Sequence, residues 1–497
     1  MSPETSVVLA FAIPLAGAVL IAATGSLPNL REAVTLVTGA ALLIVVASLV
    51  PEVLAGARPS VDLVEWVPGI QLRFTVEPLG MIFAGVAALL WPVNSLYSIG
   101  YMRGNGESHQ TRFYVFFAIA IAAAIGVAFA GNLLTLFVFY EALTLSTYPL
   151  VTHKGTEDAK RGGRAYLGIL MTTSIGLLFF AIVWTWQATG TTEFTEGGIL
   201  SGHLEGAQVG LLLFLFMFGI GKAAIMPVHR WLPAAMVAPT PVSALLHAVA
   251  VVKAGVFSVV KVLVYVFGFE LLQAEPSTRW LLYAAGFTVI AASVVALRIA
   301  LEQGNLKRML AYSTISQLSY IVLSAAIFVP ISAAGAGLHI VAHAFGKITL
   351  FFAAGSIYTA AHKTEIGQLK GIGRRMPWTM GAFAIGALSM IGLPPAGGFV
   401  SKWYILLGAF EADQFLVMGI LVVSTLLNAA YFVPIVYMAF FMEEEAPIGG
   451  NGDSRGHGEA PLPIVMALSA TAVLTVLLFF FPDVPLALAH AFTGGGP

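Results

Sequence analysis

Cysteine is missing from this chain of 497 residues, so disulfides, iron–sulfur clusters and thiolate metal sites are excluded. Charge is scarce as well: Asp, Glu, Lys and Arg make up 10% of the residues, against about a quarter in soluble domains. No GxGxxG turn opens a helix after a strand, and no HExxH pattern is present. We therefore expect neither a cofactor nor a metal ion, and the net charge of -1 gives no sign of a nucleic-acid partner.

Hydrophobic residues, by contrast, make up 58% of the chain, and its mean hydropathy is +0.90. Apolar runs recur from end to end, and about 14 of them have the roughly 20 residues that cross a hydrocarbon core. The pattern predicts an all-α polytopic membrane protein. The first run follows a segment without basic residues, so we expect a retained helix and not a cleaved signal. The predicted helices are 6–24, 32–50, 79–101, 112–130, 132–151, 163–188, 208–228, 240–267, 279–300, 308–328, 332–360, 378–410, 414–441 and 461–482.

Basic residues are distributed unevenly between the loops. One set of alternate loops holds sixteen Lys and Arg residues, whereas the other holds only Arg58, Arg73 and Arg279. Because basic loops stay in the cytoplasm, both termini are predicted to lie outside a bacterial or archaeal plasma membrane. The longest outer loop alternates apolar and polar residues at 61–67, which predicts a short hairpin. The Gly- and Pro-rich segment 446–461 predicts a flexible cytoplasmic linker.

Six ionisable residues lie inside segments that otherwise read as membrane-spanning helices. Such a group is expensive at bilayer depth, and residues of this kind usually hold or pass ions or protons. Their presence indicates a transporter. The six residues are Glu141, Lys222, Lys253, Lys261, Lys347 and Lys402.

Glu141 lies near the middle of FVFYEALTLSTYPL, where hydroxyl side chains are its only polar company. An unpaired carboxylate at this depth gains most from a nearby ammonium. We therefore expect an ion pair between Glu141 and a lysine of another helix. The alternative is a glutamate that burial neutralises or that bonds to a neighbouring helix.

Two predicted helices, the seventh and the twelfth, are interrupted by proline, and each carries one lysine. Lys222 precedes Pro227 and Pro233, and Lys402 follows Pro394 and Pro395. Backbone freed by proline at membrane depth is tolerated where it lines protein or a wet cavity, which is the usual place of an ion site. A kink that serves only packing is the alternative. Because the broken helices are five helices apart, they predict two five-helix repeats, the second inverted.

The eighth helix carries His247, Lys253 and Lys261. His247 and Lys253 are six residues apart and therefore lie on faces about 120° apart, which lets one side chain face each neighbouring helix. Lys261 lies nearer the outer end, where we expect it to snorkel to the membrane interface.

The eleventh helix carries His339, His343 and Lys347 at i, i+4 and i+8, which form a stripe about 12 Å long. A lone histidine is more often a satisfied core residue. Two histidines and a lysine on one face predict a proton relay, because imidazole exchanges protons near neutral pH. His339 and His343 are also possible zinc ligands, but no HExxH pattern or cysteine supports a zinc site.

Taken together, these segments resemble the antiporter-like subunits shared by Mrp-type sodium/proton antiporters, respiratory complex I and membrane-bound hydrogenases. The resemblance covers nearly the whole chain. It implies the fold predicted above, with two inverted five-helix repeats and a hydrated polar axis through the middle of the membrane. The matching segments are FVFYEALTLSTYPL, GIGKAAIMPVHRWLPAAMVAPTPVSALLHAVAVVKAG, NLKRMLAYSTISQLSY, GLHIVAHAFGKITLFFAAG and GLPPAGGFVSKWY.

The resemblance also implies roles for individual residues. Glu141 and Lys222 match the family's ion pair, whose opening and closing is thought to gate proton movement. A lysine at position 402 disfavours the complex I subunit that has a glutamate there, and the chain looks most like the D-type subunit of Mrp antiporters. The remaining residues match the connecting position (Lys253 with His247), the central relay (His339, His343 and Lys347) and the terminal lysine of the second half-channel (Lys402).

The predicted function is that of a proton-translocating subunit in a multisubunit Mrp-type cation (sodium)/proton antiporter, with other membrane subunits as partners and no chemistry of its own. Three alternatives stay open: a proton-pumping membrane subunit of a redox complex, a subunit for proton-powered uptake of inorganic carbon, and a scaffold that transports nothing. The predicted segments are 1–111 (three helices and an outer loop), 112–267 (first repeat), 268–441 (second, inverted repeat) and 442–497 (cytoplasmic linker and last helix).

Overall fold

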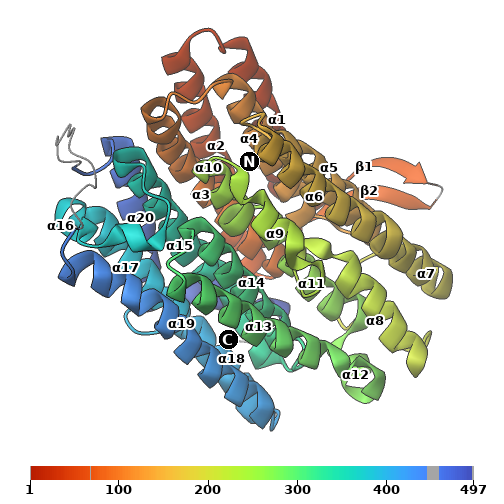
Figure 1. The fold of residues 1–497 in the computed structure, drawn as a ribbon. Coiled ribbons are helices and arrows are strands. Elements are labelled where there is room, and N and C mark those ends of the chain that lie inside the picture. The colour runs from red at the N-terminus through yellow and green to blue at the C-terminus, as the bar shows by residue number, and fades with distance from the viewer. Residues whose placement is uncertain (1, 68, 445–457, 495–497) are drawn as a thin grey trace.

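Helices dominate the structure, a computed structural model that describes residues 2–67, 69–444 and 458–494 (Figure 1). Within these residues, eleven helices are long and apolar enough to cross a membrane. The other predicted spans are α14, which is rich in hydroxyl side chains, and two interrupted spans. The prediction of an all-α polytopic membrane protein is confirmed. The unbroken spans are α1 (Pro3–Ala23), α2 (Pro28–Leu54), α3 (Pro78–Gly104), α4 (Gln110–Ala128), α5 (Leu133–Val151), α13 (Trp280–Leu301), α14 (Leu306–Ala325), α15 (Pro330–Ala361), α19 (Phe415–Phe441) and α20 (Leu462–Phe480).

Two further spans contain π-helical turns, which occur frequently at functional sites. His247 lies in one of these turns, η5. The sixth span consists of α6 (Glu157–Thr173), η1 (Ser174–Leu178) and α7 (Phe179–Thr189). The eighth span, called here the α10–α11 span, consists of α10 (Thr240–Ala244), η5 (Leu245–Val249), α11 (Val251–Val262) and η6 (Leu263–Phe267).

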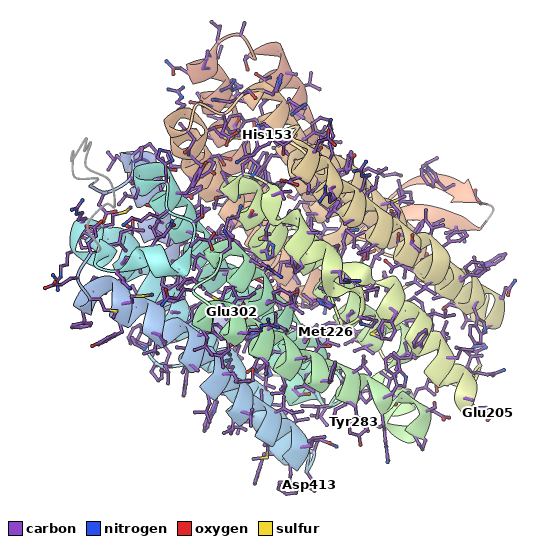
Figure 2. The ribbon with its side chains drawn as sticks, viewed as in Figure 1. His153, Glu205, Met226, Tyr283, Glu302 and Asp413 are labelled. Carbon is purple, nitrogen blue, oxygen red and sulfur yellow. The ribbon has the colours of Figure 1, made fainter. Side chains whose placement is uncertain are left out.

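Both predicted broken helices are confirmed. In the seventh span α8 (Ala207–Gly219) ends just before Lys222, and only short turns follow, because Pro227 and Pro233 have no backbone N–H to donate. The twelfth span is interrupted at Gly392, whose φ of 91° suits glycine. Figure 2 labels Met226, beside the first break, near the middle of the molecule. The short turns are η2 (Gly221–Ala223), η3 (Val228–Arg230), α9 (Trp231–Ala234) and η4 (Ala235–Val237), and the twelfth span consists of α17 (Pro377–Ile391) and α18 (Gly397–Glu411).

Several helix starts follow from the local sequence. Proline occupies the first turn of α2, α3, α15, α17 and α20, where the backbone N–H would have no partner within the helix. Asn132, Thr156 and Asn305 cap α5, α6 and α14, and each side chain accepts a hydrogen bond from the backbone N–H three residues on. The termini of these helices are therefore fixed by single residues.

The connecting loops lie at two opposite ends of the helices. The end that we call the basic face holds a cavity of about 170 Å³, lined by Lys154, Lys307 and Lys363 from three different loops. The opposite end, the hairpin face, carries β1 (Ser60–Val67) and β2 (Ile70–Thr75), which pair antiparallel and confirm the predicted hairpin (Figure 1). Which face is cytoplasmic stays a prediction from the basic loops.

The central helix of the molecule is α15, whose most apolar window is entirely buried. It packs against α3, α14, α17 and α18, and so joins the two predicted repeats. The C-terminal helix α21 (Asp483–Phe492) was not predicted, because ten residues after Pro482 are too few for a span. It packs against α15 and α3. The other short elements are α12 (Phe269–Ala274), η7 (Pro276–Thr278), η8 (Ile366–Leu369) and α16 (Ile372–Arg375).

Two predictions are not tested by the fold. Most of the linker predicted at 446–461 lies outside the described residues. The division into segments 1–111, 112–267, 268–441 and 442–497 stays a prediction.

Candidate functional site

The predicted site residues lie on neighbouring elements in the interior of the molecule. Six of them have no exposed surface at all, and both carboxylate oxygens of the half-buried Glu141 are covered. Lys402 is half-buried. The six fully buried residues are Lys222, His247, Lys253, His339, His343 and Lys347.

Lys222 lies on η2, directly in the break of the seventh span, and points at α5. Its Nζ donates hydrogen bonds to the carbonyl oxygen of Tyr140 (2.8 Å) and to Thr144 Oγ1 (2.6 Å). It also lies 3.2 Å from the centre of the Tyr140 ring, a position in which an aromatic face attracts a cation. The ammonium is therefore held by neutral groups of α5.

The expected direct ion pair of Glu141 is not formed. Within the described residues, neither oxygen of Glu141 has a hydrogen-bond partner, and no lysine nitrogen lies within ion-pair distance of it. The helix geometry explains this difference, because Tyr140 and Thr144 lie one turn apart on the face that meets Lys222, whereas Glu141 is turned away by about 100°. The carboxylate still lies close enough to attract the Lys222 ammonium.

The α10–α11 span approaches this break very closely. A Cβ atom at Gly255 would clash with the backbone of Lys222 and Ala223, so only glycine permits the contact. Gly255 thus sets the separation between the Lys222 backbone and the helix that carries Lys253, two residues earlier.

Lys253 and His247 both face α15. Lys253 Nζ is in direct contact with His343 Nδ1, and the His247 ring lies 4.7 Å from the ring of Phe351. The expectation that the two side chains serve different neighbours is therefore wrong. It assumed an unbroken α-helix, whereas the π turn η5 lies between them and changes the rotation along the helix. Both nitrogens of His247 lack hydrogen-bond partners within the described residues.

His339 is fixed by two side chains. Its Nε2 lies 3.0 Å from Gln317 Oε1, and its Nδ1 lies 2.8 Å from Ser401 Oγ. Gln317 Nε2 donates to the carbonyl oxygen of Met390, which leaves Oε1 to accept the Nε2 proton of His339. The Ser401 hydroxyl can then donate to Nδ1, so the arrangement suits a neutral imidazole.

Lys347 continues the predicted stripe on α15. Its Nζ donates to Ser313 Oγ (2.8 Å), which also accepts a hydrogen bond from the hydroxyl of Tyr431 (3.0 Å). Tyr431 in turn contacts Asn428, whose side-chain nitrogen lies 3.4 Å from the carbonyl oxygen of Met390. A chain of polar groups therefore connects Lys347 with the break of the twelfth span.

Lys402 lies beside that break. Its Nζ donates to the carbonyl oxygens of Met390 (2.8 Å) and Ile391 (2.9 Å), which terminate α17. The C-terminal end of a helix carries partial negative charge and favours a cation. A pocket of about 320 Å³ adjoins the side chain and is lined by Trp403 and Leu426, both exposed on the side of the molecule.

Lys261 is not placed as expected. It does not snorkel: its side chain is 1% exposed and forms an ion pair with Glu77, which precedes α3. Its Nζ also donates to the carbonyl oxygen of Ala130 at 2.7 Å. Glu77 was assigned to the outer loop by its sequence neighbours, so nothing local identified it as a buried partner.

Sequence reasoning also missed the polar partners of the buried line. Ser313 and Gln317 lie on α14, in the segment NLKRMLAYSTISQLSY, and its run of hydroxyl and amide side chains was the available signal. Ser401, Asn428 and Tyr431 are isolated polar residues on α18 and α19, and only the fold brings them to the site.

The fold and the buried polar line together define an antiporter-like multi-pass membrane protein. The profile of the family described as NADH:quinone oxidoreductase/Mrp antiporter, transmembrane, matches residues 130–428, more than half of the chain. The chain belongs to this family. The resemblance identified from the sequence motifs is thus confirmed at the level of the family.

Three known proteins illustrate the relationship. The N-type subunit of the NADH-quinone oxidoreductase of Desulforudis audaxviator is 33% identical over 407 residues, which cover 80% of this chain and 77% of that protein. A Na(+)/H(+) antiporter subunit of Alkalihalophilus pseudofirmus is 31% identical over 458 residues, which cover 85% of this chain and 54% of that longer protein. A chain of the Mrp complex of Dietzia sp. has a similar fold, with a TM-score of 0.84, 21% identity, and coverage of 99% of this chain and 97% of that one.

Proposed function

We propose that the chain is the D-type, proton-translocating member of a multisubunit Mrp-type cation (sodium)/proton antiporter. The observation that carries the proposal is the continuous line of buried lysines and histidines from η2 through α11 and α15 to the break before α18. Lysines held by neutral groups at this depth have no evident structural use, whereas proton carriers require them. The similarity to a Na(+)/H(+) antiporter subunit supports the choice of transported ions.

In the proposed mechanism, Lys222 switches between two sets of partners. When it leaves Tyr140 and Thr144 for the unpaired carboxylate of Glu141, the ion pair closes and the positive charge moves away from Lys253. Lys253 then accepts a proton more readily, because a nearby like charge disfavours a second ammonium. A change of one pKa unit corresponds to about 1.4 kcal/mol, so modest movements of charge suffice.

The proton then passes along α15. Lys253 exchanges it with His343 Nδ1, which it contacts, and His247 lies beside this step. The rings of His343 and His339 are 6.3 Å apart, so a water molecule would have to bridge them. Lys347 and Lys402 receive the proton on the far side, and the groups titrate as one coupled set. Sodium would cross through partner subunits of the complex.

A second candidate is a proton-pumping membrane subunit of a redox complex. The specific observation in its favour is the 33% identity to the N-type subunit of an NADH-quinone oxidoreductase. In that case the same residues would move protons, and electron transfer would belong to partner proteins.

The test is sodium-dependent proton exchange in everted vesicles of an antiporter-deficient host that expresses the whole operon. We expect Glu141→Gln and Lys222→Met to lower the exchange rate at least tenfold at matched expression. Glu205→Gln and Lys160→Gln remove exposed charges and serve as matched controls, with rates within twofold of wild type. An assembled wild-type complex that shows no cation response would favour the redox candidate. Full activity of both site variants would contradict the assigned roles.

The Glu141→Gln variant also separates function from folding. Because the carboxylate has no hydrogen-bond partner within the described residues, the neutral amide removes an uncompensated buried charge. We therefore expect the Tm of the purified complex to stay the same or to rise while exchange is lost. A large fall in Tm would mean that Glu141 holds the fold together.

A further inference from the structure

The α10–α11 span has two very different ends. At the basic face, Thr240 at its first turn lines the cavity that also contains Lys307. At the hairpin face, the span ends in η6, which is covered by the loop after α7. In that loop the backbone N–H of Ile199 donates to the carbonyl oxygen of Val266 at 2.8 Å. One end is therefore hollow and polar, and the other is closed by backbone hydrogen bonds.

The Glu77–Lys261 ion pair lies just inside the closed end. The two side chains are 10% and 1% exposed. The rings of Phe194 and Phe257 lie 4.4 Å and 5.4 Å from Lys261 Nζ and exclude solvent from it. On the outer side, the nearest surface charges are the loosely paired Arg58 and Glu196, whose atoms are 3.8 Å apart.

A polar position remains between this pair and Lys253. Ser258, on the same helix, has a buried hydroxyl without a hydrogen-bond partner within the described residues. It lies five residues after Lys253 and three before Lys261. The interior is thus polar up to the ion pair and closed beyond it. Stability alone explains the pair poorly, because a buried ion pair is often no better than apolar packing.

We propose that the Glu77–Lys261 ion pair is a seal at the hairpin end of the α10–α11 span. The seal determines the face with which Lys253 exchanges protons: it blocks the hairpin face and leaves the basic face, through the cavity at Thr240. Removal of one partner would leave a buried charge that must be hydrated, and water would then reach Ser258. This inference rests on the proposed function, because the seal matters only if Lys253 carries a proton.

The experiment measures sided access to Ser258. The chain has no cysteine, so Ser258→Cys provides its only thiol. A membrane-impermeant cationic methanethiosulfonate is added to the assembled complex in right-side-out or everted vesicles, and the labelling rate of this subunit is measured. The exposed Ser201→Cys, on the loop before α8, identifies the vesicles in which the hairpin face is accessible.

With the pair intact, we expect slow labelling of Ser258→Cys from the hairpin face. Lys261→Met or Glu77→Gln should raise this rate at least tenfold from that face only. Lys261→Arg, which keeps the ion pair, should leave it low, and so should Arg58→Gln at the surface. The double variant Glu77→Gln with Lys261→Met carries no buried charge and should assemble and stay closed, so that misfolding of the single variants cannot imitate the result.

Two outcomes would overturn the seal: unchanged labelling in both single variants, or an equal increase from both faces. Because labelling requires no transport, the outcome is independent of the proposed function. Loss of antiport in the wild type together with sided labelling would reject the function and keep the seal. Normal antiport with labelling that ignores the pair would do the reverse.

Discussion

At the scale of single residues, the buried lysines differ in the groups that hold them. Lys222 and Lys402 donate to backbone carbonyls that helix breaks or turns leave accessible, and Lys253 and Lys347 contact neutral side chains. Lys261 alone among them has a carboxylate within ion-pair distance in the described part of the chain. Four lysines therefore lack a fixed counter-ion, which suits groups that gain and lose protons, whereas the fifth is locked.

His153 gives a prediction that is independent of transport. It lies in the loop between α5 and α6, is 2% exposed, and its ring nitrogens have no hydrogen-bond partner within the described residues (Figure 2). Burial, together with the nearby Arg112, lowers the pKa of His153 to about 4 from its usual 6.5. The unfolded chain therefore binds a proton at a higher pH than the folded chain. Stability is complete above pH 6.5 and falls as the pH drops from there towards about 4.

We expect this single group to remove about 3 kcal/mol of stability across that window. His153→Phe abolishes the titration and keeps an aromatic ring beside Phe113, so its Tm should fall less than that of wild type between pH 6.5 and 4. The Tm of the purified complex at each pH measures the effect. His203→Phe, at an exposed position, is the control and should follow the wild type. Parallel curves for His153→Phe and wild type would refute the prediction.

At the scale of elements, the contact between α11 and η2 depends on the missing side chain of Gly255. A methyl group there meets the backbone of Lys222 and Ala223, which cannot rotate away. We expect Gly255→Ala to destabilise the complex by about 1–3 kcal/mol and to lower proton exchange, because Lys222 moves relative to α5. Gly168→Ala, in open space on α6, is the matched control for an added methyl group. Equal behaviour of the two variants would show that the approach is not needed.

The elements were largely predictable and the side-chain partners were not. Apolar runs located the spans, and proline pairs located both breaks, because these signals are local and strong in a membrane. The π turn at His247 has no such signature, and it overturned the estimated angle to Lys253. Glu77 and Asn428 are distant in sequence from most of the groups that they contact, so only the packed fold could reveal them.

At the scale of the whole molecule, the orientation in the membrane connects the site to its function. The basic face gathers lysines from several loops around one cavity, whereas the hairpin face carries few basic residues. Positive loops remain in the cytoplasm, so the basic face should lie inside and the hairpin face outside. The seal proposed at Glu77 and Lys261 would then close the outer side of the first repeat.

Reporter fusions test this orientation. If both termini lie outside, alkaline phosphatase fused after Pro497 should be active and green fluorescent protein at the same site should stay dark. Fusions after Glu443 omit α20 and should reverse both signals, because one span fewer places the junction in the cytoplasm. The reversal is an internal control, since both junctions use the same promoter and the same preceding spans. Active phosphatase after Glu443 and a dark reporter there would place the basic face outside, and the cavity at Thr240 would then take protons from the opposite compartment to the one proposed.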